Sequence, residues 1–496
     1  MNRILKALTL ILSALIVALT FSACGDSYQD AIIYFEIPEK PYTLDPQTAS
    51  TDSELVIVNN IFEGLLRKNE SGAIVCGACE SFEYNNLTYT FKLRKDIVWS
   101  NEEPLTAADF VFGLRRAVTS QTESPFVTRL FPIENAEKIY NGKAAAETLG
   151  VSAPDDYTLI IKLAYEDEDF KETLATSVAM PCNEKFFEES GGKYGLTKEY
   201  VISCGSYRLT KWVKDDTFGI RLYANSYYTG TFKAKNAAVY ITKDKEETAI
   251  ERLIDNNVDI AFIDSSLSDT ALNNGLKTVD YQNICWLMTF NSDFSDNLRK
   301  SLMMLVGKEV FAGSLKTGYT AANSIFPSAV LENATSASIT QYNPTEGKKL
   351  FAAEVAKLSD KKFPTGVKLY YYDNGVIKPV ITDIVGHWQN NLGAFVNIEA
   401  VDSADKLTSE LKNQTLSMAV FPVRADSSDI SEYLRNFGVS YHGESPDEIQ
   451  TKLLKGHHII PIAFQNTTIA YSSALNDVFT ELGNGYIDFS FIVKTE

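Results

Sequence analysis

Charged residues follow a predicted strand in the last fifth of the chain. The strand covers Leu416 to Val423, and the next residues are Arg424, Ala425, Asp426, Ser427, Ser428 and Asp429. Ligands of α/β sheets bind beyond the carboxyl ends of the strands, so this loop is a candidate binding site. Asp426 can hold a cationic group, because a charge taken out of water needs an opposite charge with good hydrogen bonds. Arg424 could cover Asp426 or bind a ligand carboxylate. The alternative is that Asp426 is a solvated loop acid or a capping acid.

The cysteines show no arrangement typical of a metal centre. Cys76-Gly-Ala-Cys79 has the CxxC spacing, but no second CxxC and no histidine cluster accompanies it, which argues against zinc. We interpret this CxxC as a local variation without redox or metal function. Five cysteines remain beyond Cys24, so at least one of them stays free or pairs transiently. They are Cys76, Cys79, Cys182, Cys204 and Cys285.

Signatures of catalysis are missing from the sequence. Of the four histidines only His457 and His458 adjoin, and neighbours in a strand face opposite sides, so a nickel site has little support. The sequence has no serine nucleophile elbow, no paired catalytic carboxylates at a diagnostic motif and no P-loop. The absence of these motifs does not exclude an enzyme by itself. We expect no cofactor.

The first residues are typical of an export signal. Arg3 and Lys6 precede an apolar run from Leu8 to Phe21, which is shorter than the ~20 residues that a spanning helix needs. Small residues stand directly before Cys24, as in the site that lipoprotein signal peptidase cleaves. We predict that residues 1–23 are removed and that Cys24 is lipidated, since two acyl chains hold a protein stably at a membrane. An ordinary signal peptide with an incidental cysteine is the alternative.

Size and charge limit the function further. A chain of 496 residues exceeds a single core, so two or three sub-domains are expected. The net charge of −18 argues against binding nucleic acid or clinging to anionic lipid. These properties fit an exported protein.

Strands and helices alternate along the chain, which predicts α/β sheets. A first strand is expected at Ile32–Phe35, a βαβ unit at residues 237–263, and a buried strand from Cys285. The clearest βαβαβ pattern comes last. It comprises strands at Val367–Tyr372, Phe395–Val401 and Leu416–Val423 and helices at Val376–Asn391 and Ser403–Lys412.

A block from Leu44 to Val118 combines several strong local signals. Asp52 or Ser53 can cap a helix whose apolar residues recur at helical spacing. Tyr89 to Leu93 alternates apolar and polar residues, as a half-buried strand does. Thr106-Ala107-Ala108-Asp109 is a capping box, so a second helix is expected to begin near Phe110.

The sequences of the motifs in this block, and their order, resemble those of a known family. LDPQ from Leu44, IFEGLL from Ile61, YTFKLRKDIVWS from Tyr89 and LTAADFVFGLRR from Leu105 match the family 5 extracellular solute-binding proteins, the oligopeptide- and nickel-binding receptors of ABC importers. The family's G-W-x-A-D-Y-x-D/E-P motif is matched in part by Ala425-Asp426 and Asp429. Pro422, Val423 and Ser427 depart from it.

The resemblance implies a set of ligand-binding residues. In peptide-binding members the first acid of the motif holds the α-ammonium group, which assigns that role to Asp426. A segment corresponding to Ser50, Thr51 and Asp52 pairs with the extended peptide like an added strand. The resemblance also suggests a disulfide between Cys182 and Cys204, because the family pairs these segments within one sub-domain.

The implied fold is α/β, a two-lobed periplasmic-binding-protein-like fold of the cluster C type, with mixed sheets and an extra α+β insertion sub-domain in lobe I. We expect the lobe I core in residues 24–66, 181–284 and 465–496, the insertion in 67–180, and lobe II in 285–464. Few residues separate Asp429 from the strand Ile459–Phe464, so we expect lobe II to be trimmed and its cleft more open.

The implied function is capture of short peptides between the lobes by hinge closure and delivery to an ABC permease pair with cytoplasmic ATPases. The family resemblance thus implies a protein that is not an enzyme. We expect a monomer, lipid-anchored at the extracellular face of the cell membrane (the periplasmic side where an outer membrane is present). Two alternatives remain. The ligand could be another solute such as an oligosaccharide, a nickel chelate or haem, or the protein could be a surface receptor or scaffold that does not transport.

Overall fold

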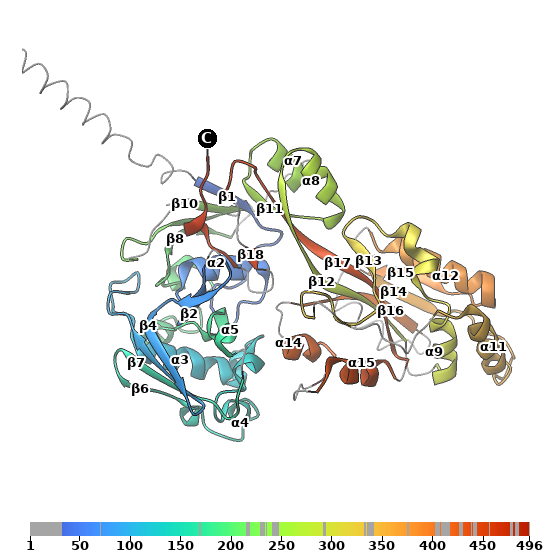
Figure 1. The fold of residues 1–496 in the computed structure, drawn as a ribbon, viewed down its shortest axis with the longest axis horizontal. Helices are drawn as coiled ribbons and strands as arrows, with labels where there is room; N and C mark the ends of the chain where they lie inside the picture. Colours follow the sequence, from blue (N-terminus) through green and yellow to red (C-terminus); the bar gives the residue numbers. More distant parts are fainter. Residues whose placement is uncertain are drawn as a thin grey trace, which may run out of the picture.

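The molecule has two lobes joined by a pair of long strands (Figure 1). The structure is a computed structural model, and it describes residues 32–69, 71–167, 170–214, 219–228, 234, 236–240, 248–290, 294–331, 334, 342–373, 376–401, 407, 417–425, 430–437, 439, 444–455, 457–476, 480–481 and 486–495. Lobe I, on the left in Figure 1, contains the blue and green segments and the end of the chain. Lobe II, on the right, contains most of the yellow and orange segments.

Lobe I is built on one half of a large mixed sheet. Its central strand, β1 (Ile32–Glu36), runs parallel to β10 (Asn236–Tyr240) on one side and to β11 (Ile260–Ile263) on the other. Helix α7 (Ala249–Ile254) connects β10 to β11, which confirms the predicted βαβ unit. Antiparallel strands β9 (Gly219–Ala224) and β8 (Tyr207–Val213) complete this side of the sheet.

Helix α2 (Asp52–Ile61) packs beside this sheet and lies between the LDPQ and IFEGLL motifs. Its N-cap is Thr51, so the prediction that Asp52 or Ser53 caps the helix is wrong. The Thr51 hydroxyl accepts the Glu54 N–H, and the Glu54 carboxylate accepts the N–H groups of Ser50 and Thr51. This capping box places the start of the helix one residue earlier, because Thr-x-x-Glu satisfies two free helix donors at once.

The residues between α2 and β8 add a smaller α+β unit to lobe I. Its sheet has the order β4 (Cys79–Asn85), β5 (Thr88–Leu93), β7 (Thr158–Lys162) and β6 (Val151–Asp155). Tyr89, Phe91 and Leu93 are buried along β5, which confirms the predicted half-buried strand. Helix α3 (Ala107–Val118) covers this sheet and has the predicted capping box of Thr106 and Asp109. The helix begins at Ala107, so the predicted start at Phe110 is wrong, because Thr106 is the N-cap. The other elements of lobe I are β2 (Leu66–Lys68), β3 (Ile74–Cys76), η2 (Ser120–Thr122), η3 (Val127–Leu130), α4 (Ala136–Tyr140), η4 (Ala146–Thr148), α5 (Phe170–Leu174), η5 (Ser177–Ala179), α6 (Glu184–Glu189), η6 (Lys198–Tyr200), η7 (Ser265–Leu267), α8 (Ser268–Asn273), β18 (Thr480–Glu481), β19 (Tyr486–Ile487) and η10 (Phe489–Phe491).

A buried ion pair holds the sequence motifs of lobe I together. Arg116, from the LRR end of α3, donates to Asp45 of the LDPQ loop at 2.6 Å, and their side chains are only 10% and 6% exposed. The same guanidinium donates to Gln47 at 2.8 Å, and Gln47 in turn donates to the Met180 carbonyl. Burial is the largest single influence and acts to lower the pKa of Arg116, but the charge and the hydrogen bond of Asp45, with smaller contributions from its other neighbours, together outweigh it and the pKa is raised. Gly113 permits this assembly, because a Cβ there would lie 2.6 Å from the Met180 carbonyl oxygen.

Lobe II contains the other half of the large sheet. β14 (Lys368–Tyr372) runs parallel to both β15 (Asn397–Val401) and β16 (Ser417–Arg424), and α12 (Lys378–Leu392) connects β14 to β15. This confirms the predicted βαβαβ pattern, except that the helix expected at Ser403–Lys412 lies almost wholly outside the described residues. The remaining elements are α9 (Asp296–Met303), α10 (Lys308–Phe311), η8 (Ala312–Ser314), β13 (Tyr319–Ala321), α11 (Pro344–Val355), α14 (Ile430–Arg435) and α15 (Pro446–Leu454).

Both faces of the lobe II sheet are covered. Along β12 (Lys277–Phe290), Trp286, Met288 and Phe290 pack into one hydrophobic cluster with α9 and α12. Cys285 and Leu287 face the other way and pack into a second cluster with α14 and α15. A strand buried on both faces explains the nearly continuous apolar sequence that begins at Cys285.

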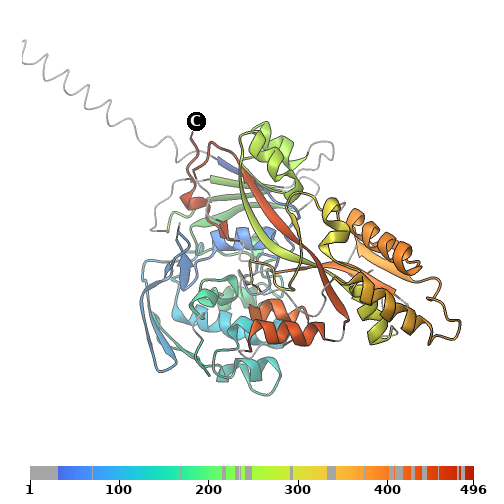
Figure 2. The same ribbon diagram turned by 45° about the vertical axis from the view of Figure 1, so that its right-hand side comes forward.

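Strands β12 and β17 (Ile459–Tyr471) connect the lobes (Figures 1 and 2). They pair antiparallel over almost their whole length. At one end β17 pairs with β11 of lobe I, and at the other end β12 pairs with β16 of lobe II, so one sheet runs through both lobes in the order β15-β14-β16-β12-β17-β11-β1-β10-β9-β8. The lobe boundaries expected after residues 284 and 464 therefore fall within these two strands. None of the described helices combines the length and the hydropathy that a membrane span requires.

The buried pair predicts a large stability effect. We expect Asp45→Asn to lower the free energy of unfolding by about 3–5 kcal/mol, because it leaves the buried Arg116 charge without its partner. Urea unfolding followed by tryptophan fluorescence measures the change. Lys185→Met is the matched control, since it removes an ion pair with Glu103 at the surface and should have a much smaller effect. A loss for Asp45→Asn no larger than for the control would contradict the structural role of the pair.

Candidate functional site

The lobes meet where β16 ends and α2 begins. Arg424, the last residue of β16, forms an ion pair with Asp52, the first residue of α2. Asp52 is 8% exposed in its side chain and Arg424 is 38% exposed. Two of the residues that the sequence analysis selected are therefore brought together from opposite lobes, although 372 positions separate them in the chain.

A second contact between the lobes lies nearby. Helix α14, which follows the β16 loop, packs against η3 of the lobe I insertion. Figure 1 shows α14 and α15 below the lobe II sheet, on the side that faces lobe I. In this structure the two lobes thus touch each other as well as being joined by β12 and β17.

The backbone at the end of β16 is fixed by Asn283, a buried residue of β12. The Asn283 carbonyl accepts the Ala425 N–H at 2.7 Å, and its side-chain oxygen accepts the Thr467 hydroxyl of β17 at 2.8 Å. The register of β12 against β17 shifts between Gln282 and Ile284, so Asn283 occupies a bulge. The bulge lies where β12 stops pairing with β16 and continues towards lobe I beside β17.

The Ser50–Asp52 segment offers fewer free groups than the sequence suggested. The N–H groups of Ser50 and Thr51 both donate to the Glu54 carboxylate, at 2.9 and 3.2 Å. Those two donors are already used within the chain, and Asp52 is paired with Arg424. A peptide that pairs with this segment must therefore use other backbone groups.

The acidic loop itself can be placed only by its two ends. Asp426, Ser427 and Asp429 lie outside the described residues. The loop leaves Ala425, which is buried beside Asn283, and returns at α14, which lies against lobe I. Its two flanks are therefore both close to lobe I.

Pro422 occupies a position in β16 that tolerates proline. The pairing of β14 with β16 ends at Val420, whereas Pro422 pairs with Trp286 of β12 on the other side only. Proline has no N–H and is accepted in a strand where one side has no neighbouring strand. This departure from the family motif is therefore compatible with the strand.

The cysteine predictions need correction. Cys182 and Cys204 are free and buried, so the disulfide suggested by the family resemblance is not formed. Each thiol instead contacts a different polar group, since Cys182 accepts from Arg116 at 3.3 Å and Cys204 accepts the Glu63 N–H at 3.4 Å. Burial raises the pKa of Cys182 to about 12, which keeps it protonated. The CxxC pair, which we interpreted as a local variation, forms a disulfide between Cys76 and Cys79.

Sequence analysis missed Asn283 and the contact of α14 with η3. Asn283 is one polar residue within a strand, and its role depends on two other strands. We know of no local pattern that would have selected it. Among the described residues, no group of three or more His, Cys, Asp or Glu side chains is arranged to hold a metal ion.

A small pocket in lobe I is distinct from the contact between the lobes. It lies beyond the carboxyl end of α2 and is lined by Glu63, Arg67 and Asp488, among others. Arg67 forms ion pairs with both acids. Burial raises the pKa of Glu63, while the Arg67 charge acts in the opposite direction. Because the charges already pair with one another, this network is better explained as the attachment of the C-terminal segment to lobe I.

The arrangement defines a class of protein. Two α/β lobes share one sheet through a two-stranded connection, and charged side chains meet where the lobes face each other. Two-lobed binding proteins are built in this way and hold their ligand between the lobes.

Comparison with known proteins identifies the family. Residues 74–445 match the model described as bacterial extracellular solute-binding proteins, family 5, middle region, and the chain belongs to this family. The family consists of solute-binding proteins, so the chain is a binding protein and not an enzyme.

Individual relatives agree with this assignment. A dipeptide-binding protein of Lactococcus lactis is 23% identical over 454 residues, which cover 85% of this chain and 82% of the relative. A probable deoxycholate-binding periplasmic protein of Escherichia coli is 26% identical over 375 residues, covering 73% and 70%. The structure of the E. coli murein tripeptide binding protein superposes with a TM-score of 0.77 at 20% identity, covering 94% and 99%. This likeness confirms the predicted two-lobed α/β fold.

The Asn283 bulge predicts a coupling between the two long strands. We expect Asn283→Ala to lower the free energy of unfolding by about 1 kcal/mol, because the hydrogen bond from the partly buried Thr467 hydroxyl is lost. We also expect faster hydrogen exchange in β12 and β17 near the bulge. Hydrogen-exchange mass spectrometry and urea unfolding measure the two effects. Asn390→Ala, on the exposed face of α12, is the control. Equal exchange in both variants would show that Asn283 does not stabilise this connection.

Proposed function

We propose that the protein captures short peptides between its lobes and releases them to a membrane permease. The observation that carries the proposal is the meeting of β16 and α2 across the lobes, directly before the loop that contains Asp426. Family membership supports capture of a solute. A peptide ligand is supported by the names of two similar proteins, the dipeptide-binding protein of Lactococcus lactis and the murein tripeptide binding protein of E. coli.

The proposed recognition rests on charge and on backbone pairing. Asp426 accepts hydrogen bonds from the α-ammonium group of the peptide, a charge-assisted contact that is strong where water is excluded. The side chain of Arg424, which is 38% exposed, and the backbone near Ser50, Thr51 and Asp52 are proposed to contact the same ligand. Specificity for sequence is low in this scheme, because backbone and terminal groups are common to all peptides.

Closure of the lobes supplies the second part of the proposal. A peptide that contacts both lobes binds the closed arrangement more tightly than the open one, so it shifts the population towards closure. The β12–β17 connection is proposed to permit such a movement, because these two strands link the lobe I half of the sheet to the lobe II half. The closed complex then docks on an ABC permease pair driven by cytoplasmic ATPases, and the binding protein acts as a monomer.

Membrane attachment is proposed through Cys24. The apolar run before it and the small residues at its amino side fit a lipoprotein signal. Lipidation would hold the protein at the extracellular face of the cell membrane, close to the permease. A mass spectrum of the N-terminal peptide of the native protein should show a diacylated Cys24. An unmodified N-terminus at another residue would contradict the anchor.

Peptide binding is tested by thermal shift and calorimetry. We expect di- to octapeptides to stabilise the protein that begins after Cys24, by about 2.7 kcal/mol at a hundred times the Kd. Asp426→Asn should weaken binding by about 2 kcal/mol or more, roughly thirty-fold, because the ammonium loses its counter-charge. N-acetylation of the peptide should cause a similar loss in the original protein and little further loss in Asp426→Asn.

Asp360→Asn, at an exposed position of lobe II, is the matched control. A peptide that binds equally well to Asp426→Asn would place the ammonium elsewhere. Binding of deoxycholate, an oligosaccharide, a nickel chelate or haem, with no response to peptides, would replace the peptide by that solute. A folded protein that binds none of these would support the receptor or scaffold alternative.

A further inference from the structure

The ion pair of Arg424 and Asp52 joins the two lobes, and ligand recognition alone does not explain this position. It connects the last residue of a lobe II strand to the first residue of a lobe I helix. Asp52 is almost completely buried in its side chain, so its charge needs a partner in this arrangement of the lobes. Arg424 is that partner, and it comes from the other lobe.

Both members of the pair stand on fixed backbone. On the lobe II side, Arg424 pairs in register with Ile284 of β12, and the next residue is held by Asn283. On the lobe I side, Asp52 begins a helix whose start is fixed by Thr51 and Glu54. The ion pair therefore connects two rigid elements, and its formation depends on the angle between the lobes.

The pair also stands directly before the loop that carries Asp426. Moving the end of β16 away from α2 would break the ion pair and move Ala425, the last described residue before Asp426, away from lobe I. The proposed function requires the end of β16 to stay beside lobe I. The packing of α14 on η3 is a second contact between the lobes nearby.

We propose that Arg424 and Asp52 form an interlobe clasp, a positioning pair that favours the closed arrangement and thereby raises the affinity for the ligand. The inference rests on closure around a ligand, as in the proposed function, but it does not depend on the ligand being a peptide. The clasp remains formed when ligand binds. It acts through the fraction of molecules that are competent to bind, since the apparent Kd is the intrinsic Kd divided by that fraction.

The size of the effect follows from the exposure of the pair. Arg424 is more than a third exposed, so solvent screens much of the attraction. We expect loss of either charge to weaken ligand binding by about five-fold. Raising the salt concentration should weaken binding in the original protein more than in the variants, because salt screens a partly exposed pair.

A double-mutant cycle separates the clasp from direct contacts with the ligand. The variants are Arg424→Gln, Asp52→Asn and the two combined. For a clasp, the double variant should be no weaker than either single variant, because the second change removes nothing further. Arg424→Lys should recover part of the affinity, since it retains the positive charge.

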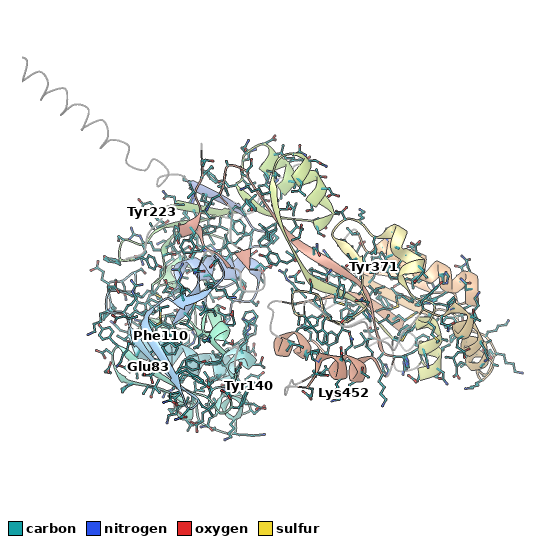
Figure 3. All side chains as sticks on the ribbon, in the orientation of Figure 1. Glu83, Phe110, Tyr140, Tyr223, Tyr371 and Lys452 are labelled. Atoms are coloured by element: carbon teal, nitrogen blue, oxygen red, sulfur yellow. A yellow bond between two sulfur atoms is a disulfide. The ribbon has the colours of Figure 1, made fainter. Side chains whose placement is uncertain are left out.

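A distance between the lobes provides a readout that needs no ligand. Spin labels can be attached at Tyr140→Cys on α4 and Lys452→Cys on α15. Figure 3 shows these two residues on opposite lobes, and both are exposed. The described cysteines outside the disulfide are buried, which favours selective labelling. We expect a longer mean distance, or a larger population of long distances, in all three variants than in the original protein.

The outcomes decide between an interlobe clasp and the alternative explanations of the Arg424–Asp52 pair. Unchanged distances in all three variants would overturn the clasp, whether or not peptides bind. Tighter binding in Arg424→Gln would overturn it too, because it would mean that the ligand must displace the pair. Additive losses confined to ligands with a free carboxylate would assign Arg424 to the ligand instead. Failure of every peptide to bind would overturn the proposed peptide ligand but leave the distance measurement able to decide on the clasp.

Discussion

The two-stranded connection of β12 and β17 is the constraint on which the rest of the molecule depends. One end of the pair belongs to the lobe I sheet through β11, and the other belongs to the lobe II sheet through β16. The strands are continuous, so the lobes share one hydrogen-bonded sheet and cannot separate. Between Lys277 and Asn283 no described strand pairs with the other edge of β12, β13 pairs with β17 only at residues 463–465, and the Asn283 bulge interrupts the register of the ribbon. A connection of this kind holds the lobes together, and the proposed capture of a ligand between the lobes requires it to bend.

The sequence motifs that match the family pattern and the candidate ligand contacts lie in different places. LDPQ and LRR are joined by the buried pair of Asp45 and Arg116, and Glu54 holds the loop before α2 by accepting four backbone N–H groups, those of Tyr42, Thr43, Ser50 and Thr51. These residues build lobe I and give α2 a fixed starting point. Asp52 and Arg424 lie instead where the two lobes meet, and Asp426 lies outside the described residues. The scaffold therefore follows the family pattern, while the β16 exit departs from it at Pro422 and Val423.

Local patterns in the sequence predicted local structure well. The alternation in β5, the capping box at Thr106 and the strands of lobe II were found because each depends on residues within a few positions. The cap of α2 was misplaced by one residue because Asp52 is also a good capping residue, and only the Thr51–Glu54 pairing decides between them. Contacts between distant segments were harder to predict. The predicted disulfide between Cys182 and Cys204 is wrong, because the family resemblance placed the two segments in one sub-domain but gave no information on the orientation of their side chains. Arg424 and Asp52 were each selected, yet their pairing depends on how the two lobes meet.

Small-angle X-ray scattering of the protein, titrated with a peptide that binds in calorimetry, would test capture between the lobes most directly. The account predicts that the radius of gyration falls with added peptide, saturates, and gives the same Kd as calorimetry, because each bound peptide closes one molecule. A peptide that binds with full occupancy and leaves the radius of gyration of an initially open population unchanged would contradict it.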